Sequence, residues 1–159
     1  MPQGAAIQWR LPLCRIDPTV MRTDLSDLLA HLQPVLLPHA YVFCHVDSAR
    51  RAACLALPPL ATFREAEGLS VVLRRSHADA LGLPYDSVHG CITLTVRSSL
   101  QAVGLTAAIA TALAAEGLSA NVIAAFHHDH VFVPDVDAQR ALRILQGLAE
   151  AHATTGHPP

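Results

Sequence analysis

The sequence contains no lysine, and all 11 of its basic side chains are arginine. A Schiff-base lysine, a lysine general base and the lysine of a phosphate-binding loop are therefore excluded. Three common catalytic or cofactor motifs, G-x-S-x-G, G-x-G-x-x-G and H-E-x-x-H, are also missing. These absences argue against an enzyme, and we expect neither catalytic residues nor a cofactor.

Cysteine pairs are missing as well. The four cysteines lie far apart and form no C-x-x-C motif, so a redox or zinc site of that type is not indicated. Cys44 and Cys91 fall inside apolar, strand-like runs, where a buried reduced thiol is the expected state. The first residues show no basic segment followed by a long apolar run. We therefore expect no signal peptide and predict a cytoplasmic protein.

Charge is scarce and scattered along the chain. Only 15% of the residues are charged and the formal net charge is −2, so no basic surface for nucleic acid is predicted. The segment 104–126 is nearly free of charge and long enough for a membrane span, but Glu116 and the helix-ending motif EGLS interrupt it. We interpret it as a buried helix followed by a strand, and we expect no membrane contact.

The first half of the chain mixes helical and extended patterns. Leucines at helical spacing, preceded by Thr23 or Asp24 as a cap, predict a helix that ends at Pro34. The segments that follow are predicted as a strand, a loop, a hairpin and a short helix capped by Ser76, over residues 41–46, 48–59, 60–75 and 76–84.

The second half gives the clearer pattern, in the order strand, helix, strand, strand, helix. The predicted ranges are 91–96, 104–117, 119–126, 131–134 and 137–151. With one further strand this order is that of the ferredoxin-like fold, an antiparallel sheet with two helices on one face. We therefore predict an α+β protein of two ferredoxin-like lobes in tandem, and leave open whether the lobes share strands. The expected divisions are an N-terminal arm, a first lobe, a second lobe and a flexible tail, at 1–22, 23–86, 87–151 and 152–159.

The segment AVGLTAAIATALAAEGLSANVI at 102–123 resembles the ACT domain, the small regulatory module of aspartokinases and other enzymes of amino-acid pathways. There a Gly-Leu pair opens the first helix, an AEAG-like motif closes it, and a strand of the INV kind follows. Together with ATFREAEGLSVVL and HHDHVFVP, the likeness covers roughly residues 24–150 and is similar to small stand-alone bacterial proteins with two ACT-like lobes. The resemblance implies a non-enzymatic sensor that binds a small molecule, an amino acid, at a lobe or subunit interface and forms a homodimer.

The resemblance also implies a position for the ligand, at the loop and helix start formed by Ser98, Ser99, Val103, Gly104 and Leu105. The unpaired N–H groups of a helix N-terminus accept a carboxylate readily, which agrees with this placement. The alternative is purely structural. Ser98 and Gln101 have the spacing of a capping box, which would start the helix earlier and leave no ligand site.

Two further groups complete the candidate ligand site. The resemblance adds the strand residues Asn121, Val122 and Ile123, with Asn121 pointing away from its apolar neighbours. Arg64, at the predicted turn of the hairpin, is a candidate for an ion pair with a ligand carboxylate across the lobes.

Three histidines and an aspartate stand together between two predicted strands: His127, His128, Asp129 and His130. A two-residue turn at His128-Asp129 would place His127 and His130 opposite each other, with Cβ atoms about 5 Å apart. Such a pair supplies two imidazoles, whereas a stable zinc site needs three or four ligands. A polar hairpin tip is therefore the preferred interpretation, and a divalent-metal-binding module is the alternative function.

Overall fold

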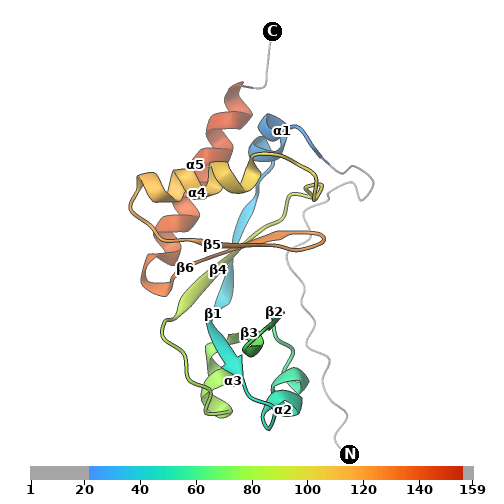
Figure 1. Cartoon of the computed structure of the whole chain (residues 1–159). Helices are drawn as coiled ribbons and strands as arrows, with labels where there is room; N and C mark the ends of the chain where they lie inside the picture. The colour runs from blue at the N-terminus through green and yellow to red at the C-terminus, as the bar shows by residue number, and fades with distance from the viewer. Residues whose placement is uncertain (1–21, 156–159) are drawn as a thin grey trace, which may run out of the picture.

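The computed structural model describes residues 22–155 (Figure 1). The elements in chain order are α1 (Leu25–Ala30), β1 (Pro34–Val46), α2 (Arg51–Ala56), β2 (Ala61–Glu65), β3 (Gly68–Arg74), α3 (Arg75–Ala80), β4 (His89–Leu94), α4 (Leu105–Ala115), β5 (Asn121–Ala124), β6 (Asp129–Pro134), the 3₁₀ turn η1 (Asp135–Asp137) and α5 (Ala138–Thr155). The predicted N-terminal arm, apart from Arg22, and the last four residues of the predicted tail lie outside this range. Among the described residues, no helix is both long and apolar enough to cross a membrane.

The six strands form one antiparallel sheet in the order β2-β3-β1-β4-β6-β5, and the two central strands serve both lobes. The first lobe runs β1-α2-β2-β3-α3-β4, and the second runs β4-α4-β5-β6-α5 with β1 as its final strand. Across the sheet, the strands of each lobe therefore lie in the order fourth, first, third and second. This is the ferredoxin-like arrangement, so the predicted fold is confirmed. The further strand that the second lobe required is β1.

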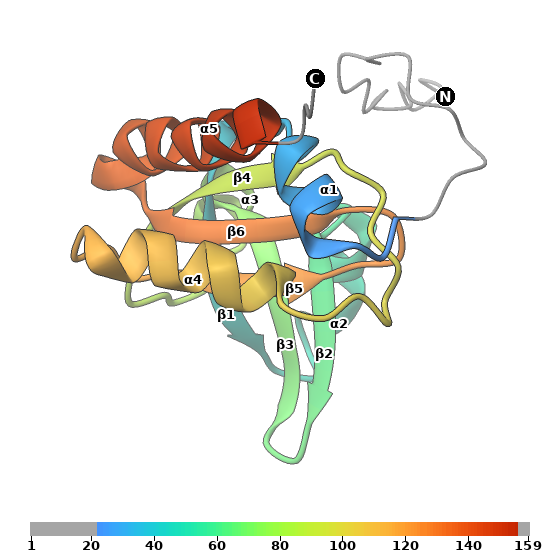
Figure 2. The same ribbon diagram turned by 90° about the horizontal axis from the view of Figure 1, so that it is seen from above.

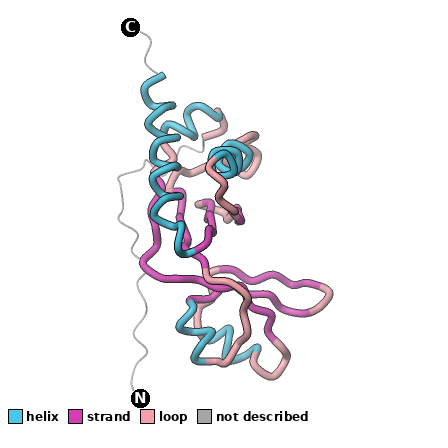
Figure 3. Tube along the Cα trace, turned by 90° about the vertical axis from the view of Figure 1, so that its left-hand side faces the viewer, coloured by secondary structure: helices cyan, strands magenta, loops and turns pink. Residues whose placement is uncertain are grey.

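The helices form two groups at opposite ends of the molecule. Figure 1 shows α1, α4 and α5 at one end, α2 and α3 at the other, and β1 running between them. The tube in Figure 3 shows the same two groups separated along this strand. The pairing of β1 with β4 shifts register between Leu36 and Ala40, and such an irregularity bends a strand and increases its twist.

Both helix groups cover the same face of the sheet. Successive residues of a strand point to opposite faces, and the strand residues that contact the two helix groups all point to one of them. The larger core packs α1, α4 and α5 on the sheet, and its largest fully buried side chains are Leu28, Leu32, Ile92, Leu94, Ile109, Leu113 and Leu145. The smaller core packs α2 and α3 on Val42, Cys44, Val46, Val71 and Leu73. The other face, which we call the open face, buries a separate cluster of Tyr41, Val72, Cys91 and Phe132.

The thiols on these strands are chemically quiet. Cys44 and Cys91 are buried and form no disulfide. Burial raises the pKa of Cys44 to about 11 and the pKa of Cys91 to about 12. Both side chains therefore stay protonated at neutral pH and pack as small apolar groups.

Three local predictions need correction. The segment 48–59 contains α2 and is not a loop. The helix was missed because six residues with Cys54 as the one buried side chain are too few to show a helical period. Ser76 lies inside α3, which begins at Arg75 without a side-chain cap. Helix α5 continues through residue 155, so the first four residues of the expected tail are helical. By contrast, Asp24 does cap α1, since its Oδ1 accepts the N–H of Asp27 at 2.9 Å.

Candidate functional site

Each lobe has a junction where its first strand passes into its first helix, and the predicted ligand site lies at one of the two. In the second lobe the β4–α4 junction comprises residues 95–104, between Leu94 and Leu105. In the first lobe the corresponding β1–α2 junction comprises residues 47–50. The two junctions occupy the same topological position, so their geometry can be compared directly.

The β4–α4 junction is covered by α1. Gly104 precedes α4 with a φ of +98°, and a Cβ placed on it would lie 2.9 Å from Cδ2 of Leu25. Leu105 is buried in the core of the second lobe. The backbone at the start of α4 therefore faces a leucine of this same chain.

Hydrogen bonds tie the rest of this junction to its surroundings. The N–H of Arg22 donates to the carbonyl of Arg97 at 3.2 Å, and the N–H of Ser99 donates to the carbonyl of Arg22 at 3.0 Å. The hydroxyl of Ser99 accepts the N–H of Gln101 at 3.2 Å. The capping box is not formed, because α4 begins only at Leu105 and has no side-chain cap.

A buried carboxylate lies beneath the junction. Asp129 begins β6 on the helix-covered face and is 6% exposed. Its Oδ2 accepts the hydroxyl of Ser98 at 3.3 Å. Burial raises the pKa of Asp129, and the Ser98 hydrogen bond and the neighbouring His128 partly oppose this effect. Of the predicted junction residues, Val103 is the most exposed, at 83%.

Within a single chain, the predicted residues of β5 lie apart from the β4–α4 junction. Asn121 pairs with Phe132 and faces the open side of the sheet, while Val122 packs into the core and Ile123 pairs with His130. Strands β4 and β5 run in the same direction, so α4 returns between them and Asn121 follows its far end. An α-helix of 11 residues is about 16 Å long, which separates Asn121 from Gly104.

The histidine-rich hairpin differs from the prediction. Ala124 pairs with Asp129, and the N–H of Ala125 donates to the carbonyl of His128, so residues 125–128 form a four-residue turn. The predicted opposition of His127 and His130 is therefore wrong. Asp129 is likewise buried at the start of β6 and does not lie at the tip.

The side chains of this hairpin point to separate places. His127 Nδ1 lies 3.1 Å from an Nη of Arg97 at the tip, whereas His130 Nδ1 lies 3.0 Å from the hydroxyl of Thr93 on the open face. Burial lowers the pKa of His130. Across residues 22–155, no three His, Cys, Asp or Glu side chains group closely enough to hold a metal ion. The metal alternative therefore has no geometric support in the described part of the chain.

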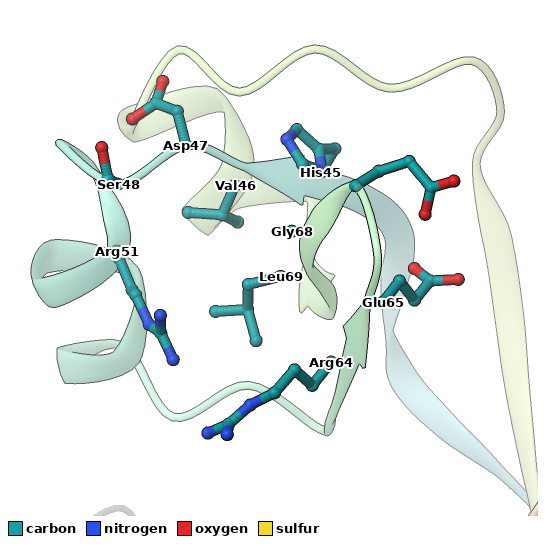
Figure 4. A pocket seen from close by; sticks show the side chains of 10 residues that line it. His45, Val46, Asp47, Ser48, Arg51, Arg64, Glu65, Gly68 and Leu69 are labelled. Atoms are coloured by element: carbon teal, nitrogen blue, oxygen red, sulfur yellow. The ribbon is translucent and has the colours of Figure 1, made fainter.

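The β1–α2 junction borders an open pocket of about 490 Å³, seen from close by in Figure 4. Val46 and Leu69 line its apolar part, and the side chains of Arg51 and Arg64 extend around Leu69 on the same side. Among the described residues, neither of these arginines forms an ion pair. Glu65 points to the opposite side of the hairpin (Figure 4). The pocket thus combines two guanidinium groups and an apolar surface with the carboxylates of Asp47 and Glu67 at its border.

The loop at this junction is fixed by a second aspartate. Asp47 Oδ1 accepts the N–H of Arg50 at 2.8 Å, and the Arg50 guanidinium pairs with Asp47 and donates to the carbonyl of Gly82 at 2.9 Å. Sequence reasoning identified Arg64 but missed Arg51. The missing signal was the helix itself, because Arg51 is the first residue of α2 and lies inside the segment 48–59 that was assigned as a loop.

Two domain-family models match the chain. Both describe an ACT domain, one over residues 22–90 and the other over residues 86–147. The first match runs from α1 to the start of β4 and the second from β4 into α5, so they overlap at the start of β4, which both lobes use. No curated protein sequence shows a significant match.

Several solved structures resemble the chain. A protein of unknown function from Vibrio cholerae, described as a possible transport protein, is 50% identical, with a TM-score of 0.70 over 79% of this chain and 95% of that one. A protein from Agrobacterium tumefaciens is 15% identical, with a TM-score of 0.55 over 73% and 87%. The ligand-free regulatory subunit of aspartate kinase from Thermus thermophilus is 9% identical, with a TM-score of 0.56 over 74% and 97%. The last two likenesses concern the fold alone.

Proposed function

Since the chain belongs to the ACT-domain family, with two such domains in tandem, we propose that it is a non-enzymatic regulatory protein that binds an amino acid. ACT domains are typically regulatory modules that bind small molecules, and this chain consists of little else over its described length. The proposed ligand site is the pocket at the β1–α2 junction. A cytoplasmic location is part of the proposal.

The observation that carries the proposal is the pair of arginines in this pocket. A guanidinium group forms short, charge-assisted hydrogen bonds with a carboxylate, and Arg51 and Arg64 reach the same side of the pocket without an ion-pair partner among the described residues. Asp47 also lines the pocket, and its carboxylate, which already pairs with Arg50, is the group that an α-ammonium group would contact. Val46 and Leu69 supply apolar surface for a ligand side chain. These are the three kinds of group that recognise a free amino acid.

The predicted residues of the second lobe have a different place in the proposal. Ser98, Ser99, Gly104 and Leu105 are covered or hydrogen-bonded within the chain, whereas Val103 is exposed. Asn121, Val122 and Ile123 lie on the edge strand β5. An edge strand carries unpaired N–H and C=O groups, which favour pairing with a second copy. We propose a homodimer in which these residues approach one another across the interface between two chains.

Thermal-shift measurements with the full chain test the ligand proposal. Each of the twenty amino acids is added at millimolar concentration, because a ligand at a hundred times its Kd stabilises the folded state by about 2.7 kcal/mol. We expect one or a few of them to raise the Tm. The corresponding amino-acid amide, which lacks the carboxylate, is expected to give no shift.

Matched variants assign the binding to the pocket. Arg51→Ala and Arg64→Ala are expected to abolish the shift while leaving the Tm without ligand within the range of surface substitutions. Arg143→Ala removes an exposed arginine from α5, far from the pocket, and is expected to keep the full shift. A shift that survives the loss of both pocket arginines, or the absence of any shift with all twenty amino acids, contradicts the proposal.

A further inference from the structure

A second pocket lies on the open face of the sheet, where no helix packs. It has a volume of about 360 Å³ and is lined by Phe43, Cys44, His45, Phe63, Glu65 and Ser70. It adjoins the tip of the β2–β3 hairpin, which projects from the body of the molecule in Figure 2. The predicted ligand residues and the two arginines of the first pocket do not line it. The two pockets share only His45 and Glu65, which lie at their common border.

Two phenylalanine rings stand on either side of this pocket. His45 on β1 pairs with Ser70 on β3, and Ser70 pairs with Phe63 on β2, so these three side chains form one row across the open face. Phe43 lies one row along β1, beside Val72. Neighbouring strands are about 4.8 Å apart, so β1 and β2 are separated by roughly 10 Å. The small side chain of Ser70 leaves this space unfilled.

The rings are partly exposed and one of them is held in place. Phe43 is 37% exposed and Phe63 is 41% exposed. The Phe43 ring makes edge-to-face contacts with Phe132 and His89, at centroid distances of 5.2 and 5.4 Å. Single exposed apolar side chains are common on protein surfaces, whereas apolar groups gathered at one place mark a candidate binding site. Here they border a hollow instead of a flat surface.

The charge at this pocket is negative. Glu65 lies on the open face, two residues beyond Phe63, and accepts the hydroxyl of Ser70. Arg64 lies between Phe63 and Glu65 on β2 and therefore faces the other side of the hairpin, as Figure 4 shows. None of the residues that line the pocket is an arginine. Apart from the polar side chains of His45 and Ser70, an anion would meet the carboxylate of Glu65, whereas a cation meets this carboxylate and two aromatic rings.

We propose that this pocket binds a small organic cation, an alkylammonium group seated between Phe43 and Phe63 and paired with Glu65. The negatively charged faces of aromatic rings attract a cation, and a methylated ammonium group also buries apolar surface against them. The Glu65 carboxylate supplies the opposite charge. The site differs from the proposed amino-acid site, because it uses neither Arg51 nor Arg64, although the two pockets share His45 and Glu65 at their border.

Two ligands of the same shape test the proposal. Choline and 3,3-dimethylbutan-1-ol differ only in that a charged nitrogen replaces a neutral carbon. Each is titrated into the full chain at neutral pH, and binding is followed by NMR through the backbone amides of β1, β2 and β3. We expect choline to bind about tenfold more tightly than the alcohol.

Matched variants locate the binding. Phe63→Leu keeps an apolar side chain but removes a ring, and Glu65→Gln removes the charge, so each is expected to abolish the preference for choline. Phe126→Leu changes a phenylalanine that is 70% exposed on the hairpin at 125–128, and Arg64→Ala changes the first pocket. Both are expected to retain the preference.

Three results would overturn the proposal. The first is the absence of any choline-induced NMR shift up to the highest choline concentration at which the protein stays soluble. The second is equal binding of choline and the alcohol. The third is a change in sedimentation, and none in choline binding, on Phe63→Leu, because the two rings would then belong to a contact between copies of the chain. The melting curve of the Phe63→Leu variant is measured first, to show that the variant is folded before its sedimentation and choline binding are compared with those of the wild type.

Discussion

The two strand–helix junctions occupy the same position in their lobes but have opposite surroundings. At the β1–α2 junction four residues, 47–50, join strand to helix beside an open pocket. At the β4–α4 junction ten residues, 95–104, make the same connection, and Leu25, Arg22 and Asp129 contact them. The difference shows that a shared fold does not determine which copy of a site stays available.

Helix α1 accounts for the difference. It is additional to both βαββαβ units, and Leu28, Leu29 and Leu32 anchor it in the core of the second lobe. Its first turn then lies over the start of α4. The first lobe has no corresponding helix among the described residues, and its smaller core leaves the junction exposed. We therefore regard α1 as the cover of the second-lobe junction, and this view can be tested.

The largest expected effect comes from releasing α1. Leu28 is fully buried, so Leu28→Ala leaves a cavity and is expected to destabilise the protein by about 2–5 kcal/mol. Leu55→Ala is the matched control, because Leu55 lies on α2 and is 46% exposed, and it is expected to cost less than about 1 kcal/mol. Urea denaturation measures both. Equal costs for the two variants would show that α1 is not anchored as described.

The next effect concerns the contact itself. Gly104→Ala places a Cβ against Leu25 and a non-glycine residue at a φ of +98°, so we expect a loss of about 1–3 kcal/mol. Gly82→Ala has a φ of +60° and no atom near its new Cβ, and it is expected to cost about 1 kcal/mol.

A double variant separates the two contributions. Combining Gly104→Ala with Leu25→Ala removes the clash but keeps the backbone strain, so the two changes should not add in urea denaturation. If the costs of Gly104→Ala and Leu25→Ala are strictly additive, the two residues do not touch and the junction is not covered by α1.

The covering of the junction could not be predicted from the sequence, whereas the fold could. Alternation in strands, leucine spacing in α1 and α5, and the small residues and Gly117 end of α4 are local signals, and they led to the correct class and lobe type. The position of Leu25 on Gly104 depends on how two segments some 80 residues apart pack, and no local pattern records this. The prediction of the turn failed for a similar reason, because the register of β6 is determined by burying Val131 and Val133, and this places Asp129 on the same buried face.

The same reasoning explains the missed arginine. Arg51 became a candidate only when α2 placed it on the same side of the pocket as Arg64, which lies on β2. A short helix with one buried side chain carries too little periodicity to be recognised. The resemblance to the family indicated a ligand site at the β4–α4 junction, at Ser98 to Leu105. It did not indicate which of the two junctions remains open.

A smaller effect compares the two aspartates that fix the junctions. Asp24 and Asp47 each accept the N–H of the residue three positions later, at 2.9 and 2.8 Å. Asp24→Ala removes the cap of α1 and is expected to cost about 1 kcal/mol of stability without weakening ligand binding at the first lobe. Asp47→Ala is expected to weaken amino-acid binding more than stability. Calorimetric titration and melting curves distinguish the two results, and a reversed pattern contradicts the assignment of the junctions.

The smallest effect, and one that depends on pH, concerns Asp129 beneath the covered junction. Burial raises its pKa, so the folded state favours the protonated carboxyl and its contribution to stability falls as the pH rises through that raised value. Asp129→Asn keeps an oxygen that accepts the Ser98 hydroxyl but carries no charge. We therefore expect the variant to match the wild type near pH 3 and to be the more stable of the two at pH 7.

The control is Asp86→Asn, which removes the same charge from an exposed position and is expected to stay within about 0.5 kcal/mol of the wild type at each pH. Urea midpoints measured from pH 3 to 8 test both variants. If Asp129→Asn were less stable than the wild type at pH 7, the charged carboxylate would itself hold the junction closed. The cover would then be electrostatic, and Leu25 would not be its main component.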